Sequence, residues 1–207
     1  MNTVDAMVLV GGRGTRLGGV DKAMLVIEGQ TLLDRVLTAL GSVDERAGMA
    51  TIGQVVVVGR AEVPAWVRCV VEEPPGSGPV AAICAGLTSL AHGRSASRWT
   101  LVIAVDQPHA ADVVPLLCAA IDDAESITTG HGARALVPVD REGRWQWLLA
   151  AYRTVDLVRA IGRLDDVAGA PMHRVFSQLT AQVAEVDDDL LGDIDTPADL
   201  LRWGGEA

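Results

Sequence analysis

The chain has 207 residues, a length that suits one domain or one domain with a small appendage. Hydrophobic residues make up 49% of it, which is enough for a full core and excludes a mainly disordered protein. The formal net charge is −10 and no basic run occurs, so a broad phosphate-contacting surface for nucleic acid is not expected.

Targeting segments are not predicted. The longest apolar runs, residues 54–58 and 100–105, have the length of strands and are far shorter than a membrane span. The N-terminus does not combine a basic segment with a following apolar stretch, so we expect no secretion signal. These features favour a cytoplasmic protein without a membrane partner.

Strands and helices are predicted to alternate along the first 120 residues. Strands are expected at residues 6–10, 54–58, 67–71 and 100–105, and helices at 31–40, 80–90 and 112–120. The strands are continuous apolar runs, which is typical of a parallel sheet covered on both faces. We therefore predict an α/β fold, namely a three-layer, doubly wound, mostly parallel sheet.

The second half of the chain is less regular. Residues 135–139 and 147–152 are expected to pair as antiparallel strands around a turn at 141–143. Helices at 154–161 and 172–179 and a strand at 182–186 are expected to follow. A last helix is expected to begin at Thr196, with Pro197 in its first turn.

The segment after the first predicted strand is rich in glycine. Residues 8–25 read VLVGGRGTRLGGVDKAML, with five glycines among the nine residues 11–19. Glycine lets backbone N–H groups approach an anion closely. Arg16 and Lys22, with Arg13 as a weaker third cation, add charge that neutralises a triphosphate. The segment therefore indicates a nucleoside triphosphate site, with a flexible turn as the alternative.

Spacing excludes two common glycine-rich loops. The dinucleotide-binding loop needs a glycine three residues after Gly14, where this chain has Leu17. The P-loop needs lysine directly after its last glycine, followed by Ser or Thr. Here two residues separate Gly19 from Lys22, and Ala23 follows.

Lys22 is the single lysine of the chain, beside 16 arginines. Lysine and arginine differ where a compact point charge must reach a phosphate among crowded backbone. We interpret the position of Lys22 inside the glycine-rich segment as a phosphate contact, with chance as the alternative.

This segment resembles the signature of the molybdenum cofactor guanylyltransferases, a branch of the nucleotidyltransferase superfamily. Val10 and Leu17 stand where that family usually has Ala and Met. The resemblance spans roughly residues 6–201 and continues in order through residues 70–87, 103–108, 144–153 and 193–200. In the last of these, DIDTPADL, aspartates replace the family's usual Asn, which leaves the second metal ligand open.

The resemblance implies transfer of GMP from GTP to the phosphate of molybdopterin or of its molybdenum form, with release of pyrophosphate. The attacking phosphate is already an anion, so positioning and charge neutralisation must provide catalysis. Mg²⁺ is the implied cofactor, and proteins that deliver the acceptor are candidate partners. We expect a single domain, 1–207, with a nucleotide-binding half at about 1–110 and an acceptor-binding half at about 111–207.

Asp106 is the leading candidate for a metal ligand, because it ends the most apolar predicted strand, where a solvated acid is unusual. By resemblance it is the family's magnesium-binding Asp. Asp195 is favoured over Asp193 as a second ligand, with helix capping as its alternative role. Glu73 aligns with a family Asp near the nucleotide, and Arg174 is a candidate contact for the acceptor.

The sequence therefore predicts individual site residues. The predicted catalytic residues are Arg16, Lys22 and Asp106. The predicted nucleotide contacts are Leu9, Val10, Gly11, Gly12, Gly14, Thr15, Arg16, Lys22, Glu73 and Asp106.

Three other functions are considered. Use of CTP is the close alternative, because Gln107 and the DIDTP sequence favour it, whereas the paired glycines at 11 and 12 favour GTP. A different small-phosphate nucleotidyltransferase would share the loop. A non-catalytic nucleotide-binding module is disfavoured, because it should have lost Asp106 or Lys22.

Overall fold

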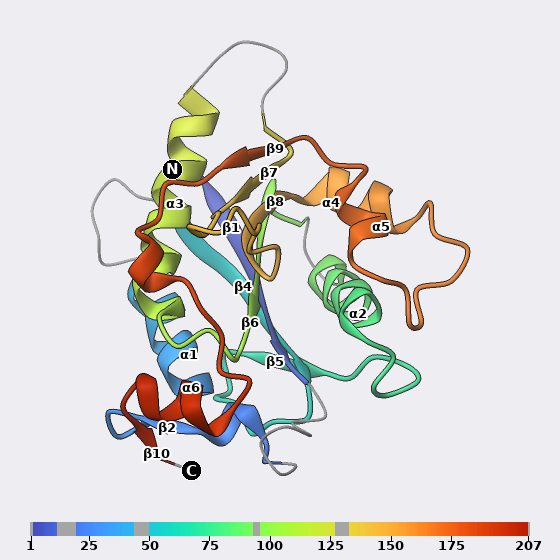
Figure 1. The fold of residues 1–207 in the computed structure, drawn as a ribbon. Helices are drawn as coiled ribbons and strands as arrows, with labels where there is room; N and C mark the ends of the chain where they lie inside the picture. Colours follow the sequence, from blue (N-terminus) through green and yellow to red (C-terminus); the bar gives the residue numbers. More distant parts are fainter. Residues whose placement is uncertain (1, 12–19, 44–49, 93–95, 127–132, 207) are drawn as a thin grey trace.

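A seven-stranded sheet forms the centre of the protein in the computed structural model (Figure 1). The structure describes residues 2–11, 20–43, 50–92, 96–126 and 133–206. The strands of this sheet, in the order β5-β4-β1-β6-β8-β7-β9, are β1 (Thr3–Val10), β4 (Thr51–Gly59), β5 (Arg68–Val70), β6 (Trp99–Ala104), β7 (Ala135–Val137), β8 (Leu149–Arg153) and β9 (Ala181–Val183). Every predicted strand is present, within a few residues of its expected limits.

One strand of this sheet is reversed. Strands β5, β4, β1 and β6 are parallel neighbours. β8 runs antiparallel to both β6 and β7, and β9 is parallel to β7. The expected antiparallel pair is therefore confirmed, and the sheet is mostly parallel as predicted.

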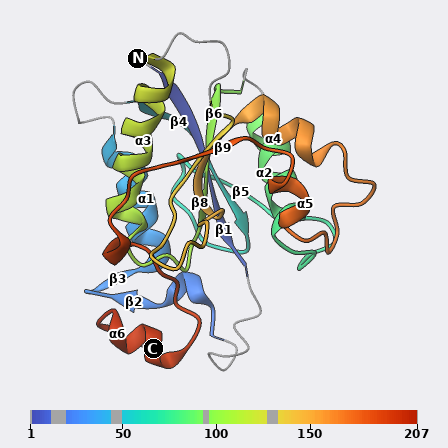
Figure 2. The ribbon, with the colours of Figure 1, turned by 45° about the horizontal axis from the view of Figure 1, so that its top comes forward.

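Helices cover both faces of the sheet (Figures 1 and 2). On one face lie α1 (Leu32–Ser42) and α3 (Ala110–Ser126), and on the other lie α2 (Pro79–Ala91), α4 (Thr154–Ile161) and α5 (His173–Phe176). β1 is buried between them: Val8 packs in the apolar cluster of α1 and α3, and Met7 in the cluster of α2. Both side chains are fully buried. The predicted three-layer α/β fold is confirmed.

A second, three-stranded sheet has no counterpart among the predicted elements. β2 (Val26–Ile27) lies between β3 (Gln30–Thr31) and β10 (Gly205–Glu206) and is antiparallel to both. Strands of two residues are too short to show a hydrophobic period. This sheet brings the C-terminal segment next to the residues that follow Lys22.

The ends of the C-terminal helices follow local chemistry. α6 (Pro197–Arg202) begins where predicted, because Thr196 and Asp199 form a reciprocal capping box and Pro197 occupies the first turn. α5 is shorter than the predicted 172–179, because the N–H groups of Gln178 and Leu179 donate to carbonyls three residues back. No helix in the described part of the chain is long and apolar enough to cross a membrane.

Asp5, in β1, links this strand to β4 and to the segment before β6. Its side chain is buried, and its carboxylate accepts hydrogen bonds from the N–H groups of Gln54 and Ser97, each at 2.9 Å. The register between β1 and β4 shifts between Val4 and Ala6, and the carboxylate takes up the Gln54 N–H at this irregularity. Asp5 therefore holds β4 and the segment before β6 against β1.

We expect Asp5→Ala to lower the free energy of unfolding by about 2–3 kcal/mol, because two part-buried N–H groups lose their acceptor. Urea denaturation followed by circular dichroism measures this change. The control is Asp123→Ala at an exposed position of α3, with an expected change below about 0.5 kcal/mol. Equal midpoints for Asp5→Ala and the unmutated protein would show that the carboxylate is not a structural link.

Candidate active site

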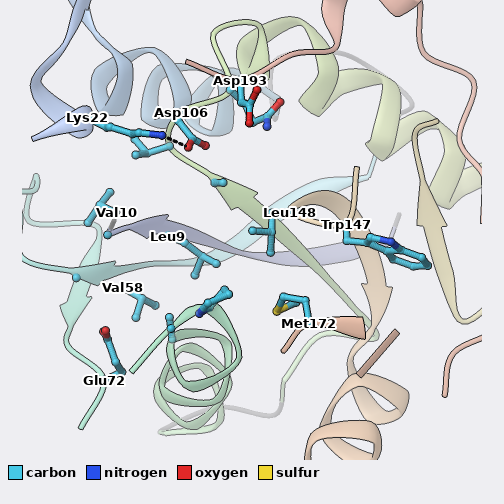
Figure 3. Close-up of a pocket in the computed structure, with 18 of the residues that line it drawn as sticks. Leu9, Val10, Lys22, Val58, Glu72, Asp106, Trp147, Leu148, Met172 and Asp193 are labelled. Carbon is cyan, nitrogen blue, oxygen red and sulfur yellow. Dashed lines mark hydrogen bonds and ion pairs between the residues drawn. The ribbon is translucent and has the colours of Figure 1, made fainter. Parts of the chain in front are cut away.

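A cavity of about 830 Å³ opens beyond the carboxyl ends of the parallel strands (Figure 3). The segments that follow β1, β4, β5 and β6 all contribute to its wall, with Val10, Gly11, Gly59, Arg60, Val71, Glu72, Val105 and Asp106 among the lining residues. Ligands bind at this edge in doubly wound sheets. The volume lies in the range of small-molecule sites.

The structure brings part of the predicted site together here. The predicted residues that line the cavity are Leu9, Val10, Gly11, Lys22 and Asp106. The predicted residues Gly12, Gly14, Thr15 and Arg16 lie outside the described part of the chain.

Lys22 lies between two carboxylates. Its ammonium donates to Oδ2 of Asp106 at 2.8 Å and to Oδ1 of Asp195 at 2.6 Å. The Lys22 side chain is 15% exposed, against 22% for Asp106 and 41% for Asp195. Burial of the ammonium opposes its charge, but the hydrogen bonds and charges of the two aspartates outweigh this effect and raise the pKa of Lys22. Lys22 therefore stays charged.

A short turn positions Lys22. The residue opens the 3₁₀ helix η2 (Lys22–Met24), whose first N–H groups need acceptors. Oδ1 of Asp21 accepts from the N–H of Ala23 at 3.0 Å, and Ala23 is itself buried. The Asp-Lys-Ala sequence therefore holds the backbone while the lysine side chain points toward the carboxyl end of β6.

A backbone contact brings the second acidic segment to Asp106. The N–H of Ile194 donates to the carbonyl oxygen of Asp106 at 3.0 Å, and the Ile194 side chain is fully buried. Asp193 and Asp195 are consequently held on either side of this contact. The capping role considered for Asp195 belongs instead to Thr196, whose hydroxyl accepts from the helix.

Asp193 is a third carboxyl group at this end of the cavity, and Figure 3 shows it near Asp106. Although the residue is exposed overall, its carboxyl faces the cavity. Partial loss of hydration and the negative charges of Asp195 and Asp106 raise the pKa of Asp193. The cavity thus gathers more negative charge than Lys22 alone balances.

The donor set fits a divalent cation that is shared with a substrate. Among the described residues, no group of three or more His, Cys, Asp or Glu side chains is arranged to hold a metal ion. Asp106 and Asp195, however, both place an oxygen within hydrogen-bond distance of one nitrogen atom. Mg²⁺ is typically bound by one or two carboxylates together with substrate phosphates. Two converging carboxylates match that pattern.

Gly59 shapes the floor of the cavity. Its φ is +127°, and a Cβ at this position would lie 1.8 Å from the carbonyl oxygen of Val10. Only glycine fits such a close approach. Strand β4 can therefore end directly against the end of β1, where the glycine-rich segment begins.

Two predicted residues lie away from this cavity. Glu73 lines a separate hollow beside α2, whereas its neighbour Glu72 lines the cavity wall. Arg174 is exposed on α5 and is not among the lining residues. Glu72 and Glu73 are adjacent and chemically the same, so the sequence does not indicate which side chain lines the cavity. Glu72 was therefore not predicted.

Aromatic side chains form another part of the wall; from the sequence, Trp145 and Trp147 are candidates for packing under the acceptor site, but a core or interface role is favoured and neither is among the predicted site residues. Trp145, Trp147 and Phe176 line the cavity together with Met172. Trp145 and Trp147 are two residues apart, the spacing of side chains on one side of an extended segment, so the sequence could have indicated that they line one wall. Phe176 is far along the chain and shows no such signal.

The sequence of this chain is similar to a known protein family and to several curated proteins. The family model described as "MobA-like NTP transferase domain" matches residues 6–183. A molybdenum cofactor guanylyltransferase of Acidiphilium cryptum is 34% identical over 137 residues, covering 65% of this chain and 66% of that protein. A probable molybdenum cofactor guanylyltransferase of Deinococcus radiodurans is 27% identical over 209 residues, covering 99% and 96%. The chain spans about half to two thirds of the length of the first three curated relatives that it matches.

Solved structures share the fold. The molybdopterin-guanine dinucleotide biosynthesis protein A of Archaeoglobus fulgidus superposes with a TM-score of 0.63 at 21% identity, covering 97% of this chain and 96% of that one. The 2-C-methyl-D-erythritol 4-phosphate cytidylyltransferase of Thermus thermophilus gives 0.61 at 18%, covering 96% of each chain. Both similarities establish the architecture.

The position of Lys22 leads to a testable expectation about metal binding. We expect Lys22→Met to bind Mn²⁺ at least about tenfold more tightly than the unmutated protein when no nucleotide is present. The reason is that each charge-assisted contact that competes with the metal is worth about 1 kcal/mol, and 1.4 kcal/mol corresponds to tenfold. Electron paramagnetic resonance of free Mn²⁺ measures the affinity.

Arg60→Met, which removes another cation from the cavity wall, is the matched control and should leave Mn²⁺ affinity nearly unchanged. The double variant Lys22→Met with Asp106→Asn should lose the gain, because one of the two carboxylates is then neutral. Equal affinities for Lys22→Met and the unmutated protein would mean that the ammonium and the metal do not compete.

Proposed function

The chain belongs to the family of MobA-like NTP transferase domains, and we propose that it transfers GMP from GTP to the phosphate of molybdopterin or of its molybdenum form. Relatives named molybdenum cofactor guanylyltransferase support this substrate pair. The observation that carries the proposal is the contact of Lys22 with Asp106 and Asp195 at the edge of the sheet where nucleotides bind.

The proposed reaction exchanges one phosphoanhydride bond for another. An oxygen of the acceptor phosphate forms a bond to the α-phosphorus of GTP, and the bond from that phosphorus to the oxygen bridging to the β-phosphorus breaks. Pyrophosphate carries away the electron pair. Since the attacking oxygen is already negative, no base has to remove a proton. The protein must instead bring two anions together and reduce their repulsion.

In this scheme, Lys22 and the end of β1 bind the triphosphate of GTP. No atom of the described residues lies within 4 Å of the place where a Cβ of Gly11 would stand, so in this scheme the phosphates approach the backbone there. The ammonium of Lys22 moves from the aspartates to a phosphate oxygen when GTP enters, and Arg16 is expected to act beside it. Val58 and Glu72 line the part of the cavity beyond β4 and β5, where we place the base.

Asp106 and Asp195 are the residues that would hold Mg²⁺. When bound, this ion would supply positive charge that offsets the negative charge of the phosphates. Before substrates arrive, Lys22 supplies the positive charge that these carboxylates need. Lys22 and the ion would therefore occupy the same two carboxylates in turn.

The choice of GTP over CTP rests on the relatives rather than on the fold. The named relatives are guanylyltransferases, whereas similar structures include a cytidylyltransferase with nearly the same TM-score. Gln107, which favoured CTP, is buried in the cavity wall, and its Oε1 has no hydrogen-bond partner within the described part of the chain.

We expect Asp106→Asn to lower turnover by on the order of 100-fold or more, because the neutral amide neither holds a cation nor offsets Lys22. Pyrophosphate release with GTP, molybdopterin and Mg²⁺ measures turnover, and the unfolding midpoint checks the fold. Asp112→Asn, at an exposed acid of α3, is the control and should retain full activity. Near-normal magnesium-dependent turnover by Asp106→Asn would remove this residue from the reaction.

We expect purified protein with molybdopterin to release pyrophosphate from GTP at least about tenfold faster than from CTP at equal concentration. A difference of that size needs about 1.4 kcal/mol of discrimination, which a few hydrogen bonds to the base supply. ATP and UTP complete the series. Turnover with CTP but not with GTP would reverse the assignment of the nucleotide, and release without molybdopterin would point to hydrolysis.

A further inference from the structure

The chain concentrates its aromatic residues in one place. It has only five Trp, one Tyr and one Phe among 207 residues. Four of these seven form a single column of nearly parallel rings, in the order Trp145, Trp147, Phe176 and Tyr152. Successive ring centroids lie 5.3, 4.2 and 6.0 Å apart, with interplanar angles of 16°, 11° and 13°.

The column leads from the core to the cavity. Tyr152 is fully buried, and its hydroxyl donates to the carbonyl oxygen of Trp147 at 2.5 Å. Phe176 is buried as well, whereas Trp145 at the other end is 37% exposed. Trp147 stacks with both Phe176 and Trp145, and Trp145 is the most exposed member of the column. The outer three rings all line the cavity.

The aromatic column lies on the opposite side of the reaction centre from the proposed nucleotide site. In the sheet, β1, β4 and β5 lie on one side of β6, and β8, which Trp147 precedes in the chain, lies on the other. Asp106 follows β6 and is therefore between them. Figure 3 shows the same arrangement, with Val58 and Glu72 at one side of the cavity and Trp147 at the other.

We propose that Trp145 is the stacking platform for the flat heteroaromatic ring of the acceptor, a phosphate-bearing pterin. The inference rests on the proposed function, since it assigns the second substrate to this end of the cavity. A flat ring gains most from a parallel aromatic surface, and the loss of one such partner typically weakens binding about tenfold or more. The acceptor's phosphate then extends toward Asp106 and Lys22.

The packing below Trp145 suits this role. The rings of Trp147, Phe176 and Tyr152 support it from one side, and the Tyr152 hydroxyl ties Trp147 to the buried end. A platform that is already rigid loses little side-chain entropy when a ligand stacks on it. A column needed only for core packing would not require its last ring to be a partly exposed tryptophan.

The test is Trp145→Ala, with Trp145→Phe as a conservative variant and Trp66→Ala as the control, since Trp66 is 54% exposed and lies in a different hollow. The Michaelis constant for molybdopterin should rise about tenfold in Trp145→Ala and much less in Trp145→Phe. The dissociation constant of GTP and the unfolding midpoint should not change. An unchanged Michaelis constant for molybdopterin, or equal losses for GTP and molybdopterin, would overturn the platform.

A second measurement separates this inference from the proposed function. Binding of pterin-6-carboxylate, followed by the fluorescence of the pterin itself, requires neither GTP nor turnover. Saturable binding to the unmutated protein and to Trp66→Ala, lost in Trp145→Ala, supports the platform even if GMP transfer to molybdopterin is not observed. Equal binding to the protein with and without Trp145, or no binding to either, contradicts it.

Discussion

One ammonium group holds together three parts of the chain that are far apart in sequence. Lys22 is 84 residues from Asp106 and 173 from Asp195, yet it contacts both carboxylates. Each partner is fixed by its own backbone device: a capped 3₁₀ turn at Lys22, the end of β6 at Asp106, and the contact of Ile194 with Asp106. These three segments meet at the ammonium of Lys22, and together they form this end of the cavity.

The chemistry of lysine explains why this position differs from the rest of a chain rich in arginine. An ammonium donates in three directions from a single atom, so two carboxylates from different segments can meet at it. A guanidinium is a planar fork that matches one carboxylate side-on. Arg141 and Arg144 are used differently: each is an exposed side chain that pairs with two acids lying close together in the chain, and ion pairs of exposed side chains contribute little.

Sequence patterns were sufficient for the order of the main strands and helices, because the central strands β1, β4 and β6 contain continuous apolar runs and α1 shows a clear helical period. Lys22 and Asp106 were also predictable, one from its place in the glycine-rich segment and the other from the end of an apolar strand. The contact between them was not, because it depends on how three loops fold together. The small sheet of β2, β3 and β10 was missed, since its two-residue strands have no period to detect.

Residues whose direction depends on tertiary packing were the hardest to predict. Glu72 and Glu73 are chemically alike, and only the fold decides which one faces the cavity. The aromatic column joins residues from the loop before β8, from β8 itself and from α5, so no local pattern contains it. The resemblance to a family led us to expect an acceptor-binding half at about 111–207, and this division remains a prediction.

In the proposed function, the reversed strand β8 separates the places assigned to the two substrates. If β8 were parallel to β6, the residues just before β8 would lie at the amino end of β6, at the opposite edge of the sheet from Asp106. Because β8 runs the other way, the residues just before it, including Trp147 and Leu148, arrive at the carboxyl end of β6 directly, and the Ala104 N–H donates to the Leu148 carbonyl. One side of Asp106 is thus built from the ends of parallel strands, which suit a nucleotide, and the other from the beginning of an antiparallel one. The wall on the β8 side of Asp106 is therefore built from other segments of the chain than the wall on the β1, β4 and β5 side.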